Sequence, residues 1–136
     1  MNAHKVLIID DDETLLQLVE GVLGECDFET VLAEDGETGL EKAQEEKPNA
    51  ILLDQNMPGI NGNEVLQKLK QNPETKNIPI LMLTGDNNIS DVAKSLELGA
   101  QDYIVKPFNN ENLITRVKNV LPQDHSSSDS KSADDS

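Results

Sequence analysis

Several features are scarce or missing in this 136-residue chain, and each excludes a class of protein. Cys26 is the single cysteine, so the chain cannot hold an internal disulfide, which favours a reducing compartment. No run of about 20 apolar residues is present to span a membrane, and the N-terminal segment lacks the apolar stretch of a signal peptide. We therefore expect a cytoplasmic protein without membrane insertion.

Basic residues are few compared with acidic ones. The chain has 11 Lys and Arg against 26 Asp and Glu, a formal net charge of −15. Such a charge repels the phosphate backbone that dominates nucleic-acid affinity, so we expect no direct binding of DNA or RNA. It favours basic protein surfaces and metal cations instead. The length suits one domain without a folded effector domain, so the expected output is contact with a partner protein.

Short apolar runs alternate with longer segments of helical periodicity along the chain. The runs occupy residues 6–9, 30–33, 50–53, 78–83 and 103–105, and a helical pattern follows each of them. This alternation predicts an α/β protein with a doubly wound, five-stranded parallel sheet. The run at 50–53 is apolar throughout, so we expect helices on both of its faces.

Local signals predict where helices begin and which side chains they bury. Asp12 suits the N-cap of the first helix, and Asn61 with Glu64 three residues later forms a variant of the capping box. The first helix is expected to bury one stripe of side chains: Leu15, Leu18, Val19, Val22 and Cys26.

Residues 123–136 differ in composition from the rest of the chain. They include six serines, four aspartates and one lysine, and no large apolar side chain. Such a segment cannot bury enough surface to offset the entropy lost on ordering it. We therefore predict one domain over residues 1–121 and a disordered tail over 122–136, which serves as a solubilising end or as a docking or phosphorylation segment.

Polar side chains stand where four of the predicted strands end. Three aspartates at 10–12 follow the first strand, Asp54 follows the third, Thr84 the fourth and Lys106 the fifth. In a doubly wound sheet these ends meet at one edge, where such folds bind ligands. Clustered carboxylates normally hold a hard cation through oxygen, and Mg²⁺ suits a site that also takes a phosphoryl group. A carboxylate can act as a nucleophile on phosphorus, and Lys106 would stabilise the transferred oxygens.

Four sequence blocks resemble the signature blocks of response regulator receiver domains. They are Ile8-Ile9-Asp10-Asp11-Asp12, Leu53-Asp54-x-x-Met57-Pro58-Gly59, Leu83-Thr84-Gly85 and Tyr103-x-x-Lys106-Pro107-Phe108. The resemblance covers residues 4–121, and each block closes a predicted strand. It implies the (βα)5 flavodoxin-like receiver fold with strand order 2-1-3-4-5.

The resemblance also implies which residues form the phosphorylation site. Asp54 would be the phosphoacceptor. The ligands of Mg²⁺ would be Asp10, Asp11, Asp54 and the backbone carbonyl of Asn56. Within the acidic pair, Asp11 would be the more direct ligand.

A second group of residues would bind the phosphoryl group and respond to it. Thr84 and Lys106 would bind the phosphoryl oxygens. Thr84 and Tyr103 would then move as switch residues and change the surface of the fourth helix, fifth strand and fifth helix. Tyr103 can also be interpreted as a sheet aromatic packed against the last helix. The resemblance further implies a cis peptide bond between Lys106 and Pro107, which proline permits.

The implied partners are proteins. A sensor histidine kinase or a histidine phosphotransfer protein would donate the phosphoryl group, and a downstream protein target would contact the altered surface. The chain would be a monomer or a phosphorylation-linked dimer. It would be a signalling switch and not an enzyme, catalysing only its own phosphorylation and dephosphorylation. Asn56 and Asp86 occupy the positions that tune the dephosphorylation rate in the family.

Two other functions share parts of this pattern. A phosphatase of the haloacid-dehalogenase type also combines an aspartate nucleophile with Mg²⁺. Asp10 would then be the nucleophile and Asp12 the acid, but the block around Asp54 and the lack of a substrate cap disfavour this function. A flavodoxin-like cofactor protein would need a hydroxyl- and glycine-rich phosphate loop after the first strand, where the three aspartates would repel phosphate.

Overall fold

The computed structural model describes residues 4–85 and 89–121, so the predicted tail at 122–136 lies outside the described residues. The strands are β1 (Lys5–Ile9), β2 (Glu29–Ala33), β3 (Ala50–Asp54), β4 (Ile80–Thr84) and β5 (Asp102–Val105). The helices are α1 (Glu13–Gly24), α2 (Gly36–Glu46), α3 (Gly62–Gln71), α4 (Ile89–Glu97) and α5 (Asn110–Val120). Within the described ranges, none of the helices has the length and apolar character needed to cross a membrane.

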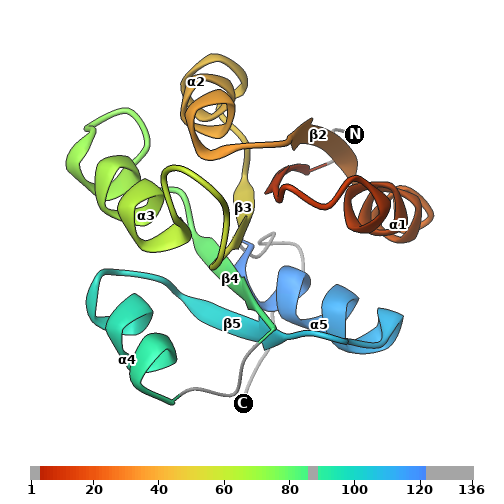
Figure 1. Ribbon diagram of the computed structural model, residues 1–136. Helices are drawn as coiled ribbons and strands as arrows, with labels where there is room; N and C mark the ends of the chain where they lie inside the picture. Colours follow the sequence, from red (N-terminus) through yellow and green to blue (C-terminus); the bar gives the residue numbers. More distant parts are fainter. Residues whose placement is uncertain (1–3, 86–88, 122–136) are drawn as a thin grey trace, which may run out of the picture.

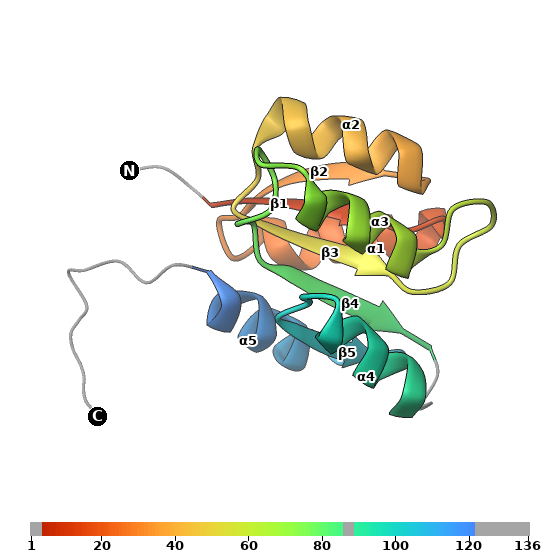
Figure 2. The same cartoon turned by 90° about the vertical axis from the view of Figure 1, so that its left-hand side faces the viewer.

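The five strands form one parallel sheet in the order β2-β1-β3-β4-β5. Figure 1 shows α1 and α5 on one face of this sheet and α2, α3 and α4 on the other. In Figure 2 the arrowheads of β3 and β4 point to the same edge of the sheet. The predicted doubly wound α/β fold and its strand order are therefore confirmed.

Apolar side chains fill both sides of the sheet. Neighbouring residues of a strand point to opposite faces. Ile8 and Leu52 accordingly belong to the cluster under α1 and α5, whereas Leu7 and Ile51 belong to the cluster under α2 and α3. Burial on both faces explains why the run at 50–53 is apolar throughout, and it confirms that expectation.

Short polar side chains cap the starts of helices. Asp12, Asp35 and Asn109 each accept a hydrogen bond from a backbone N–H of the first turn. At α3 the capping box is complete, because Asn61 Oδ1 accepts from the Glu64 N–H at 3.0 Å and the Asn61 N–H donates to Glu64 Oε1 at 3.2 Å. The predictions for Asp12 and Asn61 are confirmed, and each cap stabilises its helix by about 1 kcal/mol.

The buried stripe predicted for α1 is wrong in two places. The helix ends at Gly24, so Cys26 lies half-buried in the turn that follows. Leu18 is 48% exposed, whereas Leu16 and Leu23 are buried. Val19 and Val22 are buried as predicted. Successive helical residues point about 100° apart, so a stripe centred on Leu16, Val19 and Leu23 leaves Leu18 outside it.

Candidate functional site

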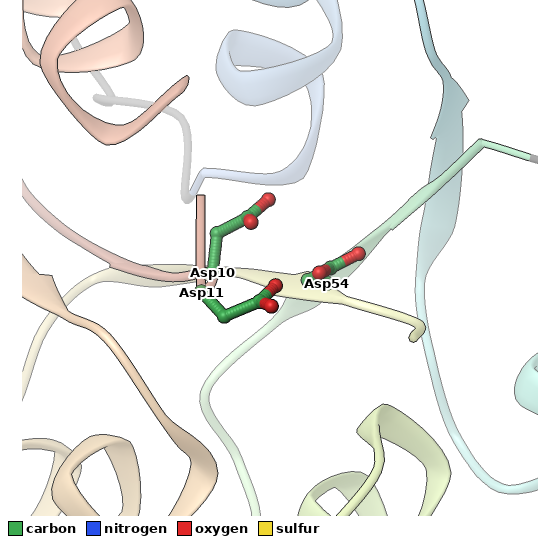
Figure 3. Close-up of side chains that lie close together, drawn as sticks. All are labelled: Asp10, Asp11 and Asp54. Carbon is green, nitrogen blue, oxygen red and sulfur yellow. The ribbon is translucent and has the colours of Figure 1, made fainter. Parts of the chain in front are cut away.

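Three aspartates lie together where β1 and β3 end. Asp10 and Asp11 follow β1, and Asp54 is the last residue of β3 (Figure 3). Each carboxylate offers one oxygen within 4.8 Å of the other two. Asp10 and Asp54 are 0% and 4% exposed, whereas Asp11 is exposed. The cluster therefore combines two buried carboxylates with one that faces solvent.

Lys106, the residue after β5, brings a positive charge to this cluster. Its Nζ donates to Asp10 Oδ2 at 3.0 Å and to Asp54 Oδ1 at 3.2 Å. Its backbone N–H donates to the Thr84 carbonyl at 2.7 Å, which holds the end of β5 beside the end of β4. The Lys106–Pro107 peptide bond is cis, as predicted. The lysine thus connects the carboxyl ends of β1, β3 and β5.

Burial and the neighbouring charges shift the pKa values of Asp54 and Lys106. Burial raises the pKa of the Asp54 carboxyl to about 6; the negative charge of Asp10 adds to the rise and Lys106 opposes it. Burial acts to lower the pKa of Lys106, but hydrogen bonds and charges from Asp10 and Asp54 outweigh burial and raise it. Lys106 is therefore a cation at neutral pH, while ionised Asp54 lacks enough compensating positive charge.

The backbone that follows Asp54 is held by two neighbouring elements. The Gln55 N–H donates to the Leu83 carbonyl of β4 at 2.8 Å, and the Gln55 carbonyl accepts from the Gly62 N–H of α3 at 3.0 Å. A Cβ on Gly62 would collide with the Asp54 carbonyl oxygen, so α3 can begin this close only because residue 62 is glycine. Asn56 is exposed, and its N–H donates to Asp54 Oδ1 at 3.4 Å. The predicted carbonyl ligand therefore belongs to a residue in contact with the cluster.

Thr84 and Tyr103 lie on the two strands beyond β3. Thr84 ends β4, is fully buried and pairs in register with Val105, the residue before Lys106. Tyr103 is half-buried on the edge strand β5 and packs against the apolar cluster under α2 and α3. From the last helix, α5, the Arg116 guanidinium lies 5.8 Å from the Tyr103 ring centroid. Tyr103 therefore contacts the last helix only through Arg116 among the described contacts, and its apolar packing is on the face of the sheet that α2 and α3 cover.

Asp12 lies next to the acidic pair in sequence but serves a different purpose. Asp12 caps α1 by accepting from the N–H groups of Thr14 and Leu15 at 3.0 and 3.3 Å, and its own N–H donates to Asp10 Oδ1 at 2.9 Å. Asp86 lies outside the described residues. The described carboxylates that face one another are therefore those of the three clustered aspartates.

Sequence reasoning missed a polar network directly behind the site. Ser95 Oγ of α4 lies 2.8 Å from Asn63 Oδ1 and 3.2 Å from Gln55 Oε1, and Gln55 Nε2 donates to Asn63 Oδ1 at 3.0 Å. Gln55 directly follows Asp54, so the network begins at the site. A single serine between Lys94 and Leu96 gives no clear sequence signal, and its importance is indicated only by its 1% exposure in the fold.

The oxygen atoms at this edge suit a hard divalent cation. Mg²⁺ binds carboxylate and carbonyl oxygens and keeps several waters beside one or two carboxylates. Asp11 faces solvent, from which such waters come. The raised pKa of Asp54 means that a further positive charge would stabilise its ionised form. The residues present therefore fit Mg²⁺.

Comparisons with known proteins agree on one family. The family model for the response regulator receiver domain matches residues 6–118. The alkaline phosphatase synthesis transcriptional regulatory protein PhoP of Bacillus subtilis is 40% identical over 117 residues, or 86% of this chain and 48% of that protein. The phosphate regulon transcriptional regulatory protein PhoB of Escherichia coli is 36% identical over 119 residues, or 88% of this chain and 52% of that protein. The chain spans about half the length of these relatives.

A solved structure matches the fold over almost its full length. The chemotaxis protein CheY4 of Vibrio cholerae has a TM-score of 0.84 at 34% identity, covering 88% of this chain and 99% of that one. These matches give the phosphatase alternative no support. The sequence blocks, the sheet order, the cluster at the strand ends and the family match agree, and the chain therefore belongs to the response regulator receiver domain family, a family of signalling switches in two-component systems.

Proposed function

We propose that the chain accepts a phosphoryl group on Asp54 from a phosphohistidine of a sensor histidine kinase or a histidine phosphotransfer protein. The supporting observation is the Asp54 carboxylate, which ends β3 only 4% exposed, beside Lys106 and two other carboxylates. During transfer, a bond forms between an Asp54 oxygen and phosphorus while the bond from phosphorus to the histidine nitrogen breaks. The released histidine takes up a proton from solvent.

The rest of the cluster would support this transfer. Mg²⁺ would be held by the carboxylates of Asp10, Asp11 and Asp54 and by the Asn56 carbonyl. When bound, it supplies positive charge that offsets the repulsion between phosphoryl oxygens and the attacking carboxylate. Lys106 would bind the phosphoryl oxygens as a second positive charge, and its contacts with Asp10 and Asp54 keep it in place for that.

The response to phosphorylation would run along the next two strands. Thr84 ends β4, the strand beside β3, and its hydroxyl would bind a phosphoryl oxygen. Tyr103 on β5 would rotate inward as Thr84 moves. These two movements would change the surface formed by α4, β5 and α5.

The altered surface would bind a downstream protein target, with the chain a monomer or a phosphorylation-linked dimer. We expect no direct nucleic-acid contact, because the net charge of −15 repels phosphate backbones. The regulatory roles in the names of the relatives belong to proteins about twice as long. The cytoplasmic location stays a prediction.

Mass spectrometry of the intact protein tests the proposal. Wild type is incubated with acetyl phosphate, with Mg²⁺ or with EDTA, and compared with Asp54→Asn. We expect a phosphoryl adduct that is stable in acid and labile in base on wild type with Mg²⁺, and none on the variant or in EDTA. Asp12→Asn is the matched control, because Asp12 caps α1 instead of joining the cluster and Asn caps equally well.

Two outcomes would count against the proposal. Folded wild type that binds Mg²⁺ but takes no phosphoryl group from acetyl phosphate or from a phosphorylated donor protein would contradict it. An adduct that survives Asp54→Asn and is lost in Asp10→Asn would identify Asp10 as the nucleophile and support the phosphatase alternative.

A further inference from the structure

Helix α4 is anchored to the rest of the protein by a polar side chain. Among its described side chains, residues 90–97, the one that is buried is Ser95, 1% exposed. Leu96 is 43% exposed and Val92 is half-buried. Helix α3 lies on the same face of the sheet as α4 (Figures 1 and 2) and buries three large apolar side chains: Val65, Leu66 and Leu69. Among the described side chains, hydrogen bonds therefore contribute more to the position of α4 than to that of α3.

These hydrogen bonds form what we name the amide–hydroxyl network, which consists of Gln55, Asn63 and Ser95. Asn63 lies in the first turn of α3, and Gln55 lies between Asp54 and Asn56. Ser95 Oγ contacts both amide groups, which also bond to each other. The network therefore links α4 to the segment that carries the phosphoacceptor.

Gln55 is the rigid member of this network. It is 5% exposed, and its backbone N–H and carbonyl are bonded to Leu83 and Gly62. Its side-chain Nε2 and Oε1 are bonded to Asn63 and Ser95. Each polar group of Gln55 has a hydrogen-bond partner. A shift of the backbone next to Asp54 must therefore break one of these hydrogen bonds or move the partner residue.

Ser95 is the member that can change partner. Its Oγ lies within 3.2 Å of three acceptor oxygens: Asn63 Oδ1, Gln55 Oε1 and the Asp91 carbonyl of its own helix. A hydroxyl has one proton to donate. When it leaves the two amides, it can donate to the Asp91 carbonyl, so α4 can separate from the network without leaving a buried donor unbonded.

We propose that the amide–hydroxyl network couples the state of Asp54 to the position of α4, an inference that rests on the proposed function. In the unloaded protein, the Ser95 hydroxyl donates to the side-chain amide oxygens of Asn63 and Gln55, which holds α4 against the start of α3. A group attached to Asp54 displaces Gln55, the Ser95 hydroxyl then donates its hydrogen bond to the Asp91 carbonyl instead, and α4 is released. The coupling is reciprocal, so a partner that binds released α4 stabilises the loaded state.

The first test is hydrogen exchange of backbone amides in the unloaded protein, measured by NMR. Ser95→Ala removes the anchor, and we expect the α4 amides to exchange about fivefold faster, the factor that corresponds to one hydrogen bond of ordinary net strength. Thr75→Ala is the matched control, because its hydroxyl is equally buried and donates to the Leu69 carbonyl at 2.7 Å, away from the network. It should leave α4 exchange unchanged relative to the other helices.

The second test uses beryllium trifluoride with Mg²⁺, which mimics a phosphoryl group on a carboxylate. In wild type, loading should shift the NMR signals of α4 amides. In unloaded Ser95→Ala, these signals should already lie towards the loaded wild-type positions and move little on loading. Gln55→Met keeps the size of the side chain without the amide, so it should shift the α4 signals in the same way as Ser95→Ala. The double variant should shift them little further, because both changes break the same network.

The outcomes separate this inference from the proposed function. It is overturned if α4 of Ser95→Ala exchanges and responds to loading like wild type, or if the effects of Ser95→Ala and Gln55→Met add fully. Wild type that binds no beryllium trifluoride would overturn the proposed function and the coupling with it. The exchange of unloaded Ser95→Ala still decides independently whether Ser95 anchors α4.

Discussion

Lys106 and Asp10 form an ion pair in which Nζ lies 3.0 Å from Oδ2 of a carboxylate that is completely buried. The Lys106 side chain is 24% exposed and also reaches Asp54 Oδ1 at 3.2 Å. One cation thus serves two buried anions that lie at the ends of different strands. The pair contributes to stability only while both partners are present, since a lone buried charge is strongly unfavourable.

We predict that Lys106→Met destabilises the metal-free protein by about 3 kcal/mol at pH 7, because Asp10 is left buried without its cation. Urea denaturation in EDTA measures the free energy of unfolding. Glu74→Gln is the control, because it breaks an exposed ion pair with Lys47. The Lys47 and Glu74 side chains are 64% and 61% exposed, so this change should have little effect on stability. Equal stabilities for the two variants would mean that Asp10 does not depend on Lys106.

Ionised Asp54 should destabilise the metal-free fold. Its pKa is raised from 3.8 to about 6, chiefly by burial, and a raised carboxyl pKa means that the folded state holds the proton more tightly than the unfolded state. The stability that comes from this proton is complete below about pH 4 and is lost as the pH rises through about 6.

Asp54→Asn should therefore be more stable than wild type in EDTA at pH 7.5, by up to about 3 kcal/mol for a shift of two pKa units. The gap should shrink as the pH falls from 7 to 5, and urea denaturation across this range measures it. A gap that stays constant with pH would show that Asp54 keeps an ordinary pKa in the folded protein.

The α/β class was predictable from the alternation of apolar runs and helical patterns, whereas the strand order was implied by the family resemblance. Strands with both faces covered are apolar throughout, as at 50–53, and Asn61 with Glu64 marks the start of α3. The cluster was predictable too, because the carboxyl ends of parallel strands converge at one edge whatever the loops do. The roles given to its residues in phosphoryl transfer stay predictions.

Other features depend on contacts that sequence spacing does not reveal. The stripe of α1 was predicted correctly at Val19 and Val22 but included Leu18 in place of Leu16, because leucines at 15, 16 and 18 fit more than one helical phase. Ser95 was missed because burial of a hydroxyl depends on partners 40 and 32 residues earlier in the chain. The raised pKa of Asp54 likewise follows from how deeply β3 is buried.

Magnesium should stabilise the protein through the acidic cluster. At a concentration 100 times its dissociation constant, a ligand that binds only the folded state adds about 2.7 kcal/mol to the free energy of unfolding. We expect Mg²⁺ to raise the melting temperature of wild type and not that of Asp11→Asn, which removes the exposed carboxylate of the cluster. Asp12→Asn should respond like wild type. An equal response of all three proteins would place the binding of Mg²⁺ elsewhere.

Gly62 should be required for the site, and Gly21 provides the matched comparison. A Cβ on Gly62 would collide with the Asp54 carbonyl and press on the Gln55 backbone, whereas a Cβ on Gly21, an exposed residue of α1, meets nothing within 4 Å. Gly21→Ala should stabilise the protein by about 1 kcal/mol, the difference in helix propensity. Gly62→Ala should destabilise it by about 2 kcal/mol, as overpacking does.

The two variants should also differ in phosphorylation, measured as adduct formed per minute from acetyl phosphate with Mg²⁺. Gly62→Ala pushes α3 away from the segment of Asp54 and Asn56, so we expect slower labelling at a temperature where the variant is folded. Gly21→Ala should label at the wild-type rate. If Gly62→Ala labels normally despite its lower stability, the approach of α3 serves packing alone. Slower labelling in the folded variant would show that this approach holds the Asp54 backbone in the position needed for attack.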